Sequence, residues 1–149
     1  MISKIIVPID GSKVARKAAK YAVELAKQTG ASLTLLSVID KRFIVSQAVS
    51  AVASPTHLTE SVEDYLKQEV KSNSEVIERL CKRNHVKCSS VVKLGHPVEE
   101  IVKEAKRIKA DLVVMGSHGK SALRAAVLGS VTFGVAHKDT EIPLLIVRR

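Results

Sequence analysis

The chain has 149 residues, which is long enough for one compact domain with a buried core, and 46% of them are hydrophobic while 26% are charged. This balance is typical of a globular protein and excludes a disordered or fibrous chain. The formal charge of +9 suits a polyanionic ligand, but only 3% of the residues are aromatic and none is interleaved with the basic residues to stack on bases, which disfavours a nucleic-acid-binding protein.

The first third of the chain predicts a strand, a helix and a second strand. Residues 4–9 form a β-branched run that is too short for a helix, and the turn sequence Asp10-Gly11-Ser12 follows it. Over residues 13–26 the apolar positions recur every three or four residues, which predicts an amphipathic helix with Ser12 as its N-cap and Gly30 just past its end. Residues 32–38 are apolar enough to form a strand that is covered on both faces.

The rest of the chain continues this alternation. Residues 42–58 have no clean period and contain Pro55, so we expect a long connection that either covers a ligand or is mobile. The remaining predicted elements are a helix over about 62–84, a strand at 87–94, a helix from Pro97, a strand at 111–115, a helix over about 130–137 and a strand at 144–147. Five strands that alternate with four helices predict an α/β fold: a doubly wound parallel sheet with helices on both faces, in one domain over residues 1–149.

The cysteines and the start of the chain give no sign of secretion. Cys81 and Cys88 lie at the end of a predicted helix and the start of the next strand, without C-x-x-C spacing, so we interpret them as reduced structural thiols. The first residues lack the basic, long apolar and small-residue segments of a signal peptide, and no uninterrupted apolar stretch reaches roughly 20 residues. We therefore expect a cytoplasmic protein.

Two predicted strand ends carry residues suited to a ligand, because open parallel sheets bind ligands beyond the carboxyl ends of their strands. At the first, Asp10 and Ser12 are either ligand-binding residues or turn and capping residues. At the second, Met115-Gly116-Ser117-His118-Gly119-Lys120-Ser121 is followed by Gly129-Ser130-Val131-Thr132. Glycines let the backbone approach a ligand, and a helix that begins at Ser130 favours an anion, so these two turns predict a phosphate cradle rather than ordinary turns.

Two common nucleotide-binding motifs do not fit. Gly119-Lys120-Ser121 looks like the end of a Walker A loop, but the first glycine of that motif would stand at position 114, where the sequence has Val114 inside a strand. The G-x-G-x-x-G fingerprint does not follow the first strand. The sequence thus disfavours a P-loop NTPase and a nicotinamide-dependent oxidoreductase.

The spacing Gly116-x-x-Gly119, then nine residues, then Gly129-Ser130 resembles the ATP-binding signature of the universal stress protein family. The resemblance extends to residues 5–12, 110–116 and 142–147, in that family's order. It implies the strand order 3-2-1-4-5, which places Asp10 beside the glycine loop. The residues that it assigns to ATP are Pro8, Ile9, Asp10 and Val38 on the adenine and ribose side, and Met115, Gly116, His118, Gly119, Gly129, Ser130, Val131 and Thr132 around the ribose and phosphates.

These motifs favour nucleotide binding over phosphoryl transfer, since Asp10 is their only carboxylate and the sequence shows no cluster of metal ligands. We expect an ATP-binding switch or regulator of the stress response that acts on a protein partner. The nucleotide would be ATP, or AMP or ADP retained on purification, with Mg²⁺ or Mn²⁺ bound through the phosphates. The alternatives are a slow Mg-dependent ATPase and, from another class, a nucleic-acid-associated basic protein.

The last predicted strand suggests how two copies would pair. Leu144, Leu145, Ile146 and Val147 would form an apolar edge of the sheet, and an unprotected edge tends to pair with another chain. The family resemblance also implies a homodimer through this strand.

Overall fold

The computed structural model describes residues 1–49, 55–120, 127–138 and 140–149. The elements in these residues are, in chain order, β1 (Lys4–Pro8), α1 (Lys13–Thr29), β2 (Ser32–Asp40), α2 (Lys41–Val49), α3 (Pro55–Arg83), β3 (Cys88–Gly95), α4 (Pro97–Ile108), β4 (Leu112–Gly116), α5 (Ser130–Ala136) and β5 (Leu144–Val147).

The five strands form one sheet in the order β3-β2-β1-β4-β5. All four neighbouring pairs are parallel, and Ile5 of β1 lies between Leu33 of β2 and Leu112 of β4. The predicted doubly wound parallel sheet and its strand order are thereby confirmed. Because β1 is central, the end of the first strand lies next to the end of the fourth, where the chain enters its glycine-rich segment.

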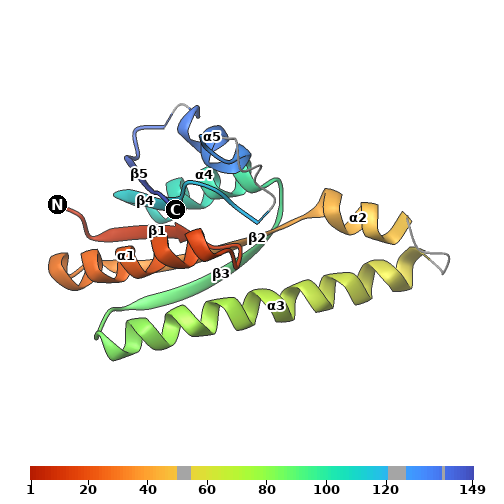
Figure 1. Ribbon diagram of the computed structural model, residues 1–149, viewed down its shortest axis with the longest axis horizontal. Coiled ribbons are helices and arrows are strands. Elements are labelled where there is room, and N and C mark those ends of the chain that lie inside the picture. The colour runs from red at the N-terminus through yellow and green to blue at the C-terminus, as the bar shows by residue number, and fades with distance from the viewer. Residues whose placement is uncertain (50–54, 121–126, 139) are drawn as a thin grey trace.

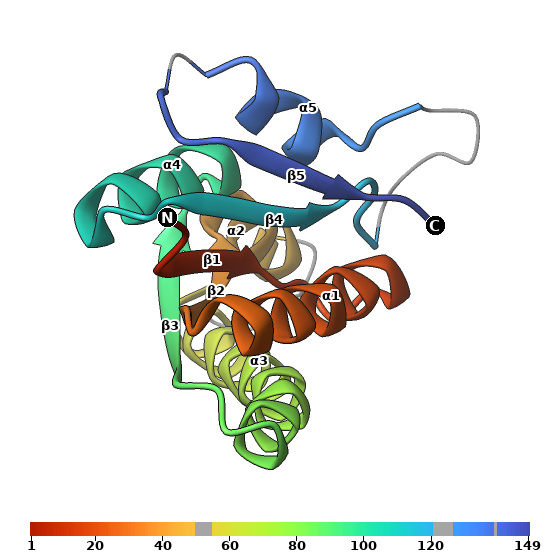
Figure 2. The same ribbon diagram turned by 90° about the vertical axis from the view of Figure 1, so that its left-hand side faces the viewer.

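Helices cover both faces of the sheet (Figure 2). Successive side chains of a strand point to opposite faces, so Ile5 and Val7 pack with α1 and α3 while Ile6 packs with α4 and α5. Alanines make up most of the buried face of α1, and their small size lets this helix lie close to the sheet. The three inner strands β1, β2 and β4 are therefore covered on both sides, whereas the edge strands β3 and β5 are only partly buried.

The predicted ends of α1 are confirmed. Ser12 Oγ accepts a hydrogen bond from the main-chain N–H of Ala15 at 3.1 Å, which caps the amino end. Gly30 ends the helix in the left-handed conformation with φ of 75°, which glycine adopts without steric strain.

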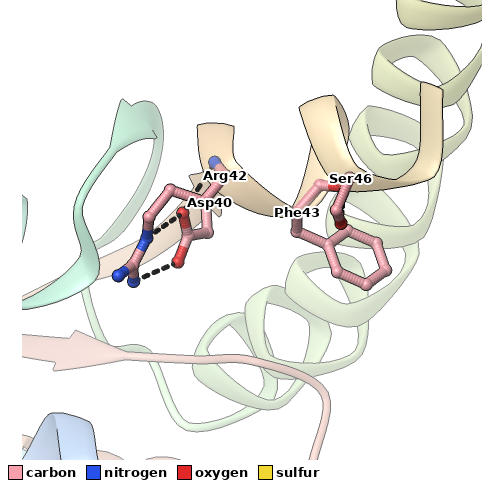
Figure 3. Close-up of polar contacts among 4 residues, drawn as sticks. All are labelled: Asp40, Arg42, Phe43 and Ser46. Atoms are coloured by element: carbon pink, nitrogen blue, oxygen red, sulfur yellow. Dashed lines mark hydrogen bonds and ion pairs between the residues drawn. The ribbon is translucent and has the colours of Figure 1, made fainter. Parts of the chain in front are cut away.

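The connection predicted at residues 42–58 is wrong wherever the structure describes it. Residues 41–49 form α2, and α3 begins at Pro55, so the described chain has five helices and not four; residues 50–54 lie outside the described part. Asp40 begins α2 as an N-cap: its carboxylate accepts from the main-chain N–H of Arg42 at 2.9 Å and from the Arg42 guanidinium at 2.8 Å (Figure 3). That guanidinium holds the pKa of Asp40 below its ordinary value.

The weak period of α2 explains the error. A helix whose apolar residues follow no single face gives no periodic signal, and the capping aspartate was its only mark in the sequence. In space α2 packs on α3, and together they extend beyond the sheet (Figure 1). This pair is called the α2–α3 arm below.

A buried carboxylate lies on α4. Glu104 is only 2% exposed, and it pairs with Arg107 at 2.6 Å and with Lys93 of β3 at 3.8 Å. The Arg107 guanidinium lowers the pKa of Glu104, so the side chain stays ionised and ties α4 to the edge strand β3.

None of the helices in the described ranges combines the length and apolar content that a membrane crossing requires.

Candidate functional site

A cleft of about 140 Å³ opens at the carboxyl ends of β1, β2 and β4. In an open parallel sheet this is the position at which ligands bind, because the chain order reverses there and the helices on the two faces diverge. The lining residues are Pro8, Ile9, Asp10, Ala15, Leu36, Val38, Pro97, Ile101, Met115, Gly116, His118, Gly119, Val131 and Thr132.

Ten of the twelve site residues predicted from the sequence line this cleft. The other two, Gly129 and Ser130, do not line it, although Gly129 lies against the loop that does. The structure thus brings together residues from three strands and from the start of α5 that are separated by up to 124 positions in the chain.

Four lining residues were missed by the sequence analysis: Ala15, Leu36, Pro97 and Ile101. Pro97 and Ile101 belong to α4, whose predicted role was only to cover the sheet. The sequence shows, at residues 94–97, a strand end followed by a helix that begins with proline. Only the strand order shows that the start of this helix, α4, lies over β1 and β2.

The walls of the cleft are mainly apolar. Pro8 and Ile9 lie at the end of β1, Val38 comes from β2, Met115 from β4 and Ile101 from α4. Apolar walls with a few polar groups are typical of sites for small molecules and cofactors. The polar groups here are Asp10, His118 and Thr132.

Asp10 joins the end of β1 to the glycine loop that follows β4. Its Oδ1 accepts from the main-chain N–H of Ser12 at 2.9 Å, and its Oδ2 accepts from the main-chain N–H of Lys120 at 3.1 Å. A carboxylate has about four acceptor positions, so these two bonds leave capacity for a ligand donor. The turn role expected for Asp10 is confirmed, and the side chain also lines the cleft, where a ligand could reach it.

At Gly116, the last residue of β4, and at Gly119 of the loop that follows, an added side chain would lie too close to its neighbours unless they moved. A Cβ atom at Gly119 would lie 2.7 Å from Asp10 Oδ2. A Cβ atom at Gly116 would lie 2.8 Å from Val14 Cγ1 in the first turn of α1. The first glycine lets α1 approach β4, and the second lets the loop approach Asp10.

The second glycine turn packs directly on the first. The N–H of Gly129 donates to the carbonyl of Ser117 at 2.7 Å, and a Cβ atom at Gly129 would lie 3.1 Å from His118 Cα. Thr132 Oγ1, which is buried, donates to the carbonyl of Gly116 at 2.8 Å. These bonds fix the start of α5 beside the end of β4, where the first N–H groups of a helix have no partner within it.

His118 is held within the loop rather than projecting from it. The side chain is 8% exposed, and its Nδ1 lies 2.8 Å from Ser117 Oγ, which is also buried. This pair stiffens the loop between its two glycines, and the ring forms part of the cleft wall.

Lys120 directs its ammonium group away from the cleft. Lys120 Nζ lies 2.7 Å from Glu69 Oε1 on α3, so the glycine loop is tied to the α2–α3 arm. A second cavity of about 310 Å³ lies beside this ion pair and shares Ile9, Asp10 and Val38 with the cleft.

Within the residues that the structure describes, no three or more histidine, cysteine, aspartate or glutamate side chains are grouped so as to hold a metal ion.

The whole chain resembles one protein family. A model of the universal stress protein family matches residues 1–148. Universal stress protein MJ0577 of Methanocaldococcus jannaschii is 34% identical over 157 residues, with all of this chain and 96% of that protein covered. Universal stress protein YxiE of Bacillus subtilis is 32% identical, with 99% of this chain and all of that protein covered.

Solved structures agree with these matches. The structure of MJ0577 superposes with a TM-score of 0.86 and covers 100% of this chain and 97% of its own. Two more distant structures share the fold. The first is a universal stress protein in complex with cAMP, at 22% identity and a TM-score of 0.71, and the match covers 99% of this chain and 97% of that one. One from Arabidopsis thaliana with AMP bound, at 24% identity and a TM-score of 0.65, covers 99% and 92%.

Proposed function

Since the chain belongs to the universal stress protein family, we propose that it binds ATP in the cleft at the carboxyl ends of β1 and β4 and acts as a nucleotide-dependent switch or regulator in the stress response. The observation that carries this proposal is the meeting of an apolar-walled cleft with two glycine turns that pack on each other. Two proteins of the same fold were solved with cAMP and with AMP, which supports an adenine nucleotide as the ligand class.

The two ends of the cleft suit the two ends of the nucleotide. The apolar side chains of Pro8, Ile9, Val38 and Met115 would enclose the base, and Asp10 would accept from the nucleoside. The phosphates would lie along the main chain from Gly116 to Gly119 and at the start of α5 near Gly129, Ser130 and Val131, where N–H groups favour an anion. Mg²⁺ or Mn²⁺ would bind through the phosphates, because the described residues supply no ligand cluster of their own.

Binding without rapid turnover fits this arrangement best. Phosphoryl transfer needs a held metal and an oriented nucleophile. Asp10 is the carboxylate that lines the cleft. It already accepts hydrogen bonds from the main-chain N–H groups of Ser12 and Lys120, so it serves to hold the loop. The alternative, a slow Mg-dependent ATPase, is separated from a binding protein by measuring ADP release from the complex.

Two measurements test this function. Protein purified without added ligand is denatured, and the released nucleotide is identified by mass spectrometry; calorimetry then compares ATP, ADP, AMP and GTP with and without Mg²⁺. We expect adenine nucleotides to bind and GTP to bind more weakly, since the apolar walls offer few partners for the additional polar groups of guanine. A wild-type protein that binds no adenine nucleotide at millimolar concentration would contradict the proposal.

We also propose a homodimer that pairs through β5. The two edge strands of the described sheet differ: β5 has only the apolar residues Leu144 to Val147, whereas β3 carries two serines and Lys93. Lysine and other polar residues on an edge strand oppose pairing with another chain, and an apolar edge favours it. The partner in this proposal is a second copy of the same chain.

The hydrogen bonds of β5 select the right substitution for a test. The carbonyl of Pro143 accepts from the N–H of Val113 in β4, and the carbonyl of Val147 accepts from the N–H of Ser117 just after it. Alternation therefore places the N–H of Leu145 on the β4 side and the N–H of Ile146 on the free edge. Ile146→Pro should therefore abolish the dimer in light scattering and leave the fold intact, while Leu145→Pro should destabilise the sheet itself. A wild-type protein that is monomeric at micromolar concentration, or an Ile146→Pro variant that still pairs, would contradict the homodimer.

A further inference from the structure

The cavity of about 310 Å³ beside the cleft lies between the end of β2, the α2–α3 arm and the glycine loop. It is called the arm cavity below. Ser37 and Ile39 of β2 line it, and they alternate with Leu36, which packs with α4 on the other face of the sheet. The volume is at the lower end of the roughly 300–1,000 Å³ that is typical of small-molecule pockets.

Ser37 brings to this cavity a hydroxyl group that the fold itself does not use. The side chain is 3% exposed, and its Oγ has no hydrogen-bond partner within the ranges that the structure describes. Every fully buried side-chain nitrogen or oxygen in those ranges does have a partner, so the Ser37 Oγ keeps contact with the cavity that the residue lines.

The other buried hydroxyl groups in the described residues show the ordinary arrangement. Ser74 Oγ donates to the carbonyl of Val70 at 3.0 Å, and Ser117 and Thr132 are bonded within the glycine loop and to it. A buried hydroxyl without a partner costs free energy, and the nearest residues on the same face of β2 are apolar. The position of Ser37 therefore indicates a hydrogen bond to a ligand rather than a role in the fold.

The charges around the arm cavity favour a cation, although the chain as a whole has a formal charge of +9. The carboxylates of Asp10, Asp40 and Glu69 line it, against the single ammonium group of Lys120 among its lining residues. Each carboxylate already accepts from a neighbour, but a carboxylate has about four acceptor positions. The cavity thus offers acceptors to N–H donors and is unsuited to a phosphate.

We propose that the arm cavity is a second binding site, which takes a small primary amine with an apolar body. The ammonium group would donate to the carboxylates and to the Ser37 hydroxyl, and such charge-assisted bonds are the stronger kind. The apolar body would pack on Phe43 of α2 and on Leu66 and Val70 of α3, which complete the lining.

The site is separate from the proposed nucleotide site. Ser37, Glu69 and the apolar residues of the arm do not line the cleft, so the test below does not depend on nucleotide binding. The Lys120 ammonium lies 2.7 Å from Glu69 Oε1 and would compete with the ligand for that carboxylate.

Calorimetry on the folded full-length protein compares 2-phenylethylamine, 2-phenylethanol and 3-phenylpropionate, which share an apolar ring and differ in charge. We expect the amine to bind at least about tenfold more tightly than the alcohol, and the carboxylate not to bind. In NMR spectra of the ¹⁵N-labelled protein, the amine should shift amide signals of residues 37–43 and 66–73. A wild type that binds no amine at millimolar concentration, that binds all three probes equally, or that shows shifts only elsewhere would overturn the proposal.

Ser37→Ala and its matched control Ser74→Ala test the hydroxyl group. Ser37→Ala should weaken amine binding by about tenfold without lowering the melting temperature, because the hydroxyl that it removes has no partner in the free protein. Ser74→Ala should lower the melting temperature and leave amine binding unchanged, because it breaks the bond to Val70. A Ser37→Ala protein that binds the amine as tightly as the wild type would overturn the proposal.

Glu69→Gln and Lys120→Ala test the charges, because they should act in opposite directions. Glu69→Gln removes an acceptor for the ligand and should weaken amine binding by about threefold, and Lys120→Ala removes the competing ammonium and should strengthen it by about as much. Changes in the same direction would overturn the proposal.

Discussion

The two ends of the β1–β4 pair each hold an aspartate that binds main-chain N–H groups, and the two ends differ in what surrounds it. At the amino end, Asp111 Oδ2 accepts from the N–H of Ser3 and of Lys4, both at 2.9 Å, and from Ser3 Oγ at 2.8 Å. At the carboxyl end, Asp10 accepts from the N–H of Ser12 and of Lys120.

The surroundings decide which end can bind a ligand. The bonds from Ser3 and Lys4 lower the pKa of Asp111, and Asp111 is not among the residues that line the cleft. Asp10 lines the cleft and lies against Gly119, which is exposed. The same bonding pattern thus stabilises the fold at the amino end of the β1–β4 pair and forms part of the cleft at the carboxyl end. Substitutions at the two ends should therefore separate effects on stability from effects on ligand binding.

The largest effect is expected from Gly129→Val, which should weaken nucleotide binding at the carboxyl end of the β1–β4 pair and leave the amino end unchanged. The added Cβ alone would lie 3.1 Å from His118 Cα and 3.4 Å from Gly119 N, so the two glycine turns must move apart. Overpacking of this kind destabilises the fold by roughly 1–3 kcal/mol. Because the displaced turns form the proposed phosphate site, ATP affinity in calorimetry should fall by more than about fivefold. Backbone strain does not contribute, because φ at Gly129 is −68°, which any residue adopts.

Gly129→Ala provides a graded control for that prediction. It adds the Cβ without the branched methyl groups, so its loss of affinity should fall between those of the wild type and Gly129→Val. A Gly129→Val protein that binds ATP as tightly as the wild type would show that the second glycine turn is not part of the site.

Asp10→Ala should have the next largest effect on binding. It removes the acceptor that holds the Lys120 N–H and any bond to the nucleoside, and an exposed charge-assisted bond of this kind contributes about 1 kcal/mol, or roughly fivefold in affinity. Discrimination between ATP and GTP should fall more than discrimination between ATP and ADP. Equal loss for all four nucleotides would mean that Asp10 serves only the loop.

Asp111→Ala should impair the amino end and leave the cleft unchanged. The melting temperature should fall by several degrees at neutral pH, because the N–H groups of Ser3 and Lys4 lose their acceptor, while ATP affinity stays at the wild-type value. The pKa of Asp111 is lowered in the folded protein, so its contribution is present above the ordinary value of 3.8 and is lost as the pH falls through the folded value.

Thermal unfolding of the wild type and of Asp111→Ala as a function of pH measures this contribution. The gap between their melting temperatures should be constant above about pH 5 and should close only below the ordinary aspartate pKa. A gap that closes near neutral pH would identify a different titrating group.

The smallest effect is expected from Lys120→Ala and its matched partner Glu69→Gln. Each removes an ion pair whose side chains are 51% and 38% exposed, and surface pairs of this kind contribute at most about 1 kcal/mol. ATP affinity should change by less than about threefold in calorimetry, because the phosphates are proposed to bind main-chain N–H groups rather than this ammonium. A tenfold loss in Lys120→Ala alone would mean that Lys120 leaves Glu69 and binds phosphate.

Much of the fold could be predicted because its signals are local. The β-branched runs at β1 and β4 and the Ser12 cap are each read within a few residues, and each lies where it was predicted. The α2 helix was missed because its apolar residues show little periodicity, and a single capping aspartate was not enough to identify it.

By itself the sequence determined the order and type of most elements and placed chemically suited residues at two strand ends. Only the tertiary structure decided how those ends meet. The bond between Asp10 and Lys120 joins residues that are 110 positions apart in the chain. Pro97 and Ile101 reach the cleft only because α4 crosses the central strands. Gly129 is crowded by His118 rather than strained by its own backbone. Local patterns are set by the chain's own geometry, whereas contacts of this kind depend on the packing of elements that no short stretch of sequence contains.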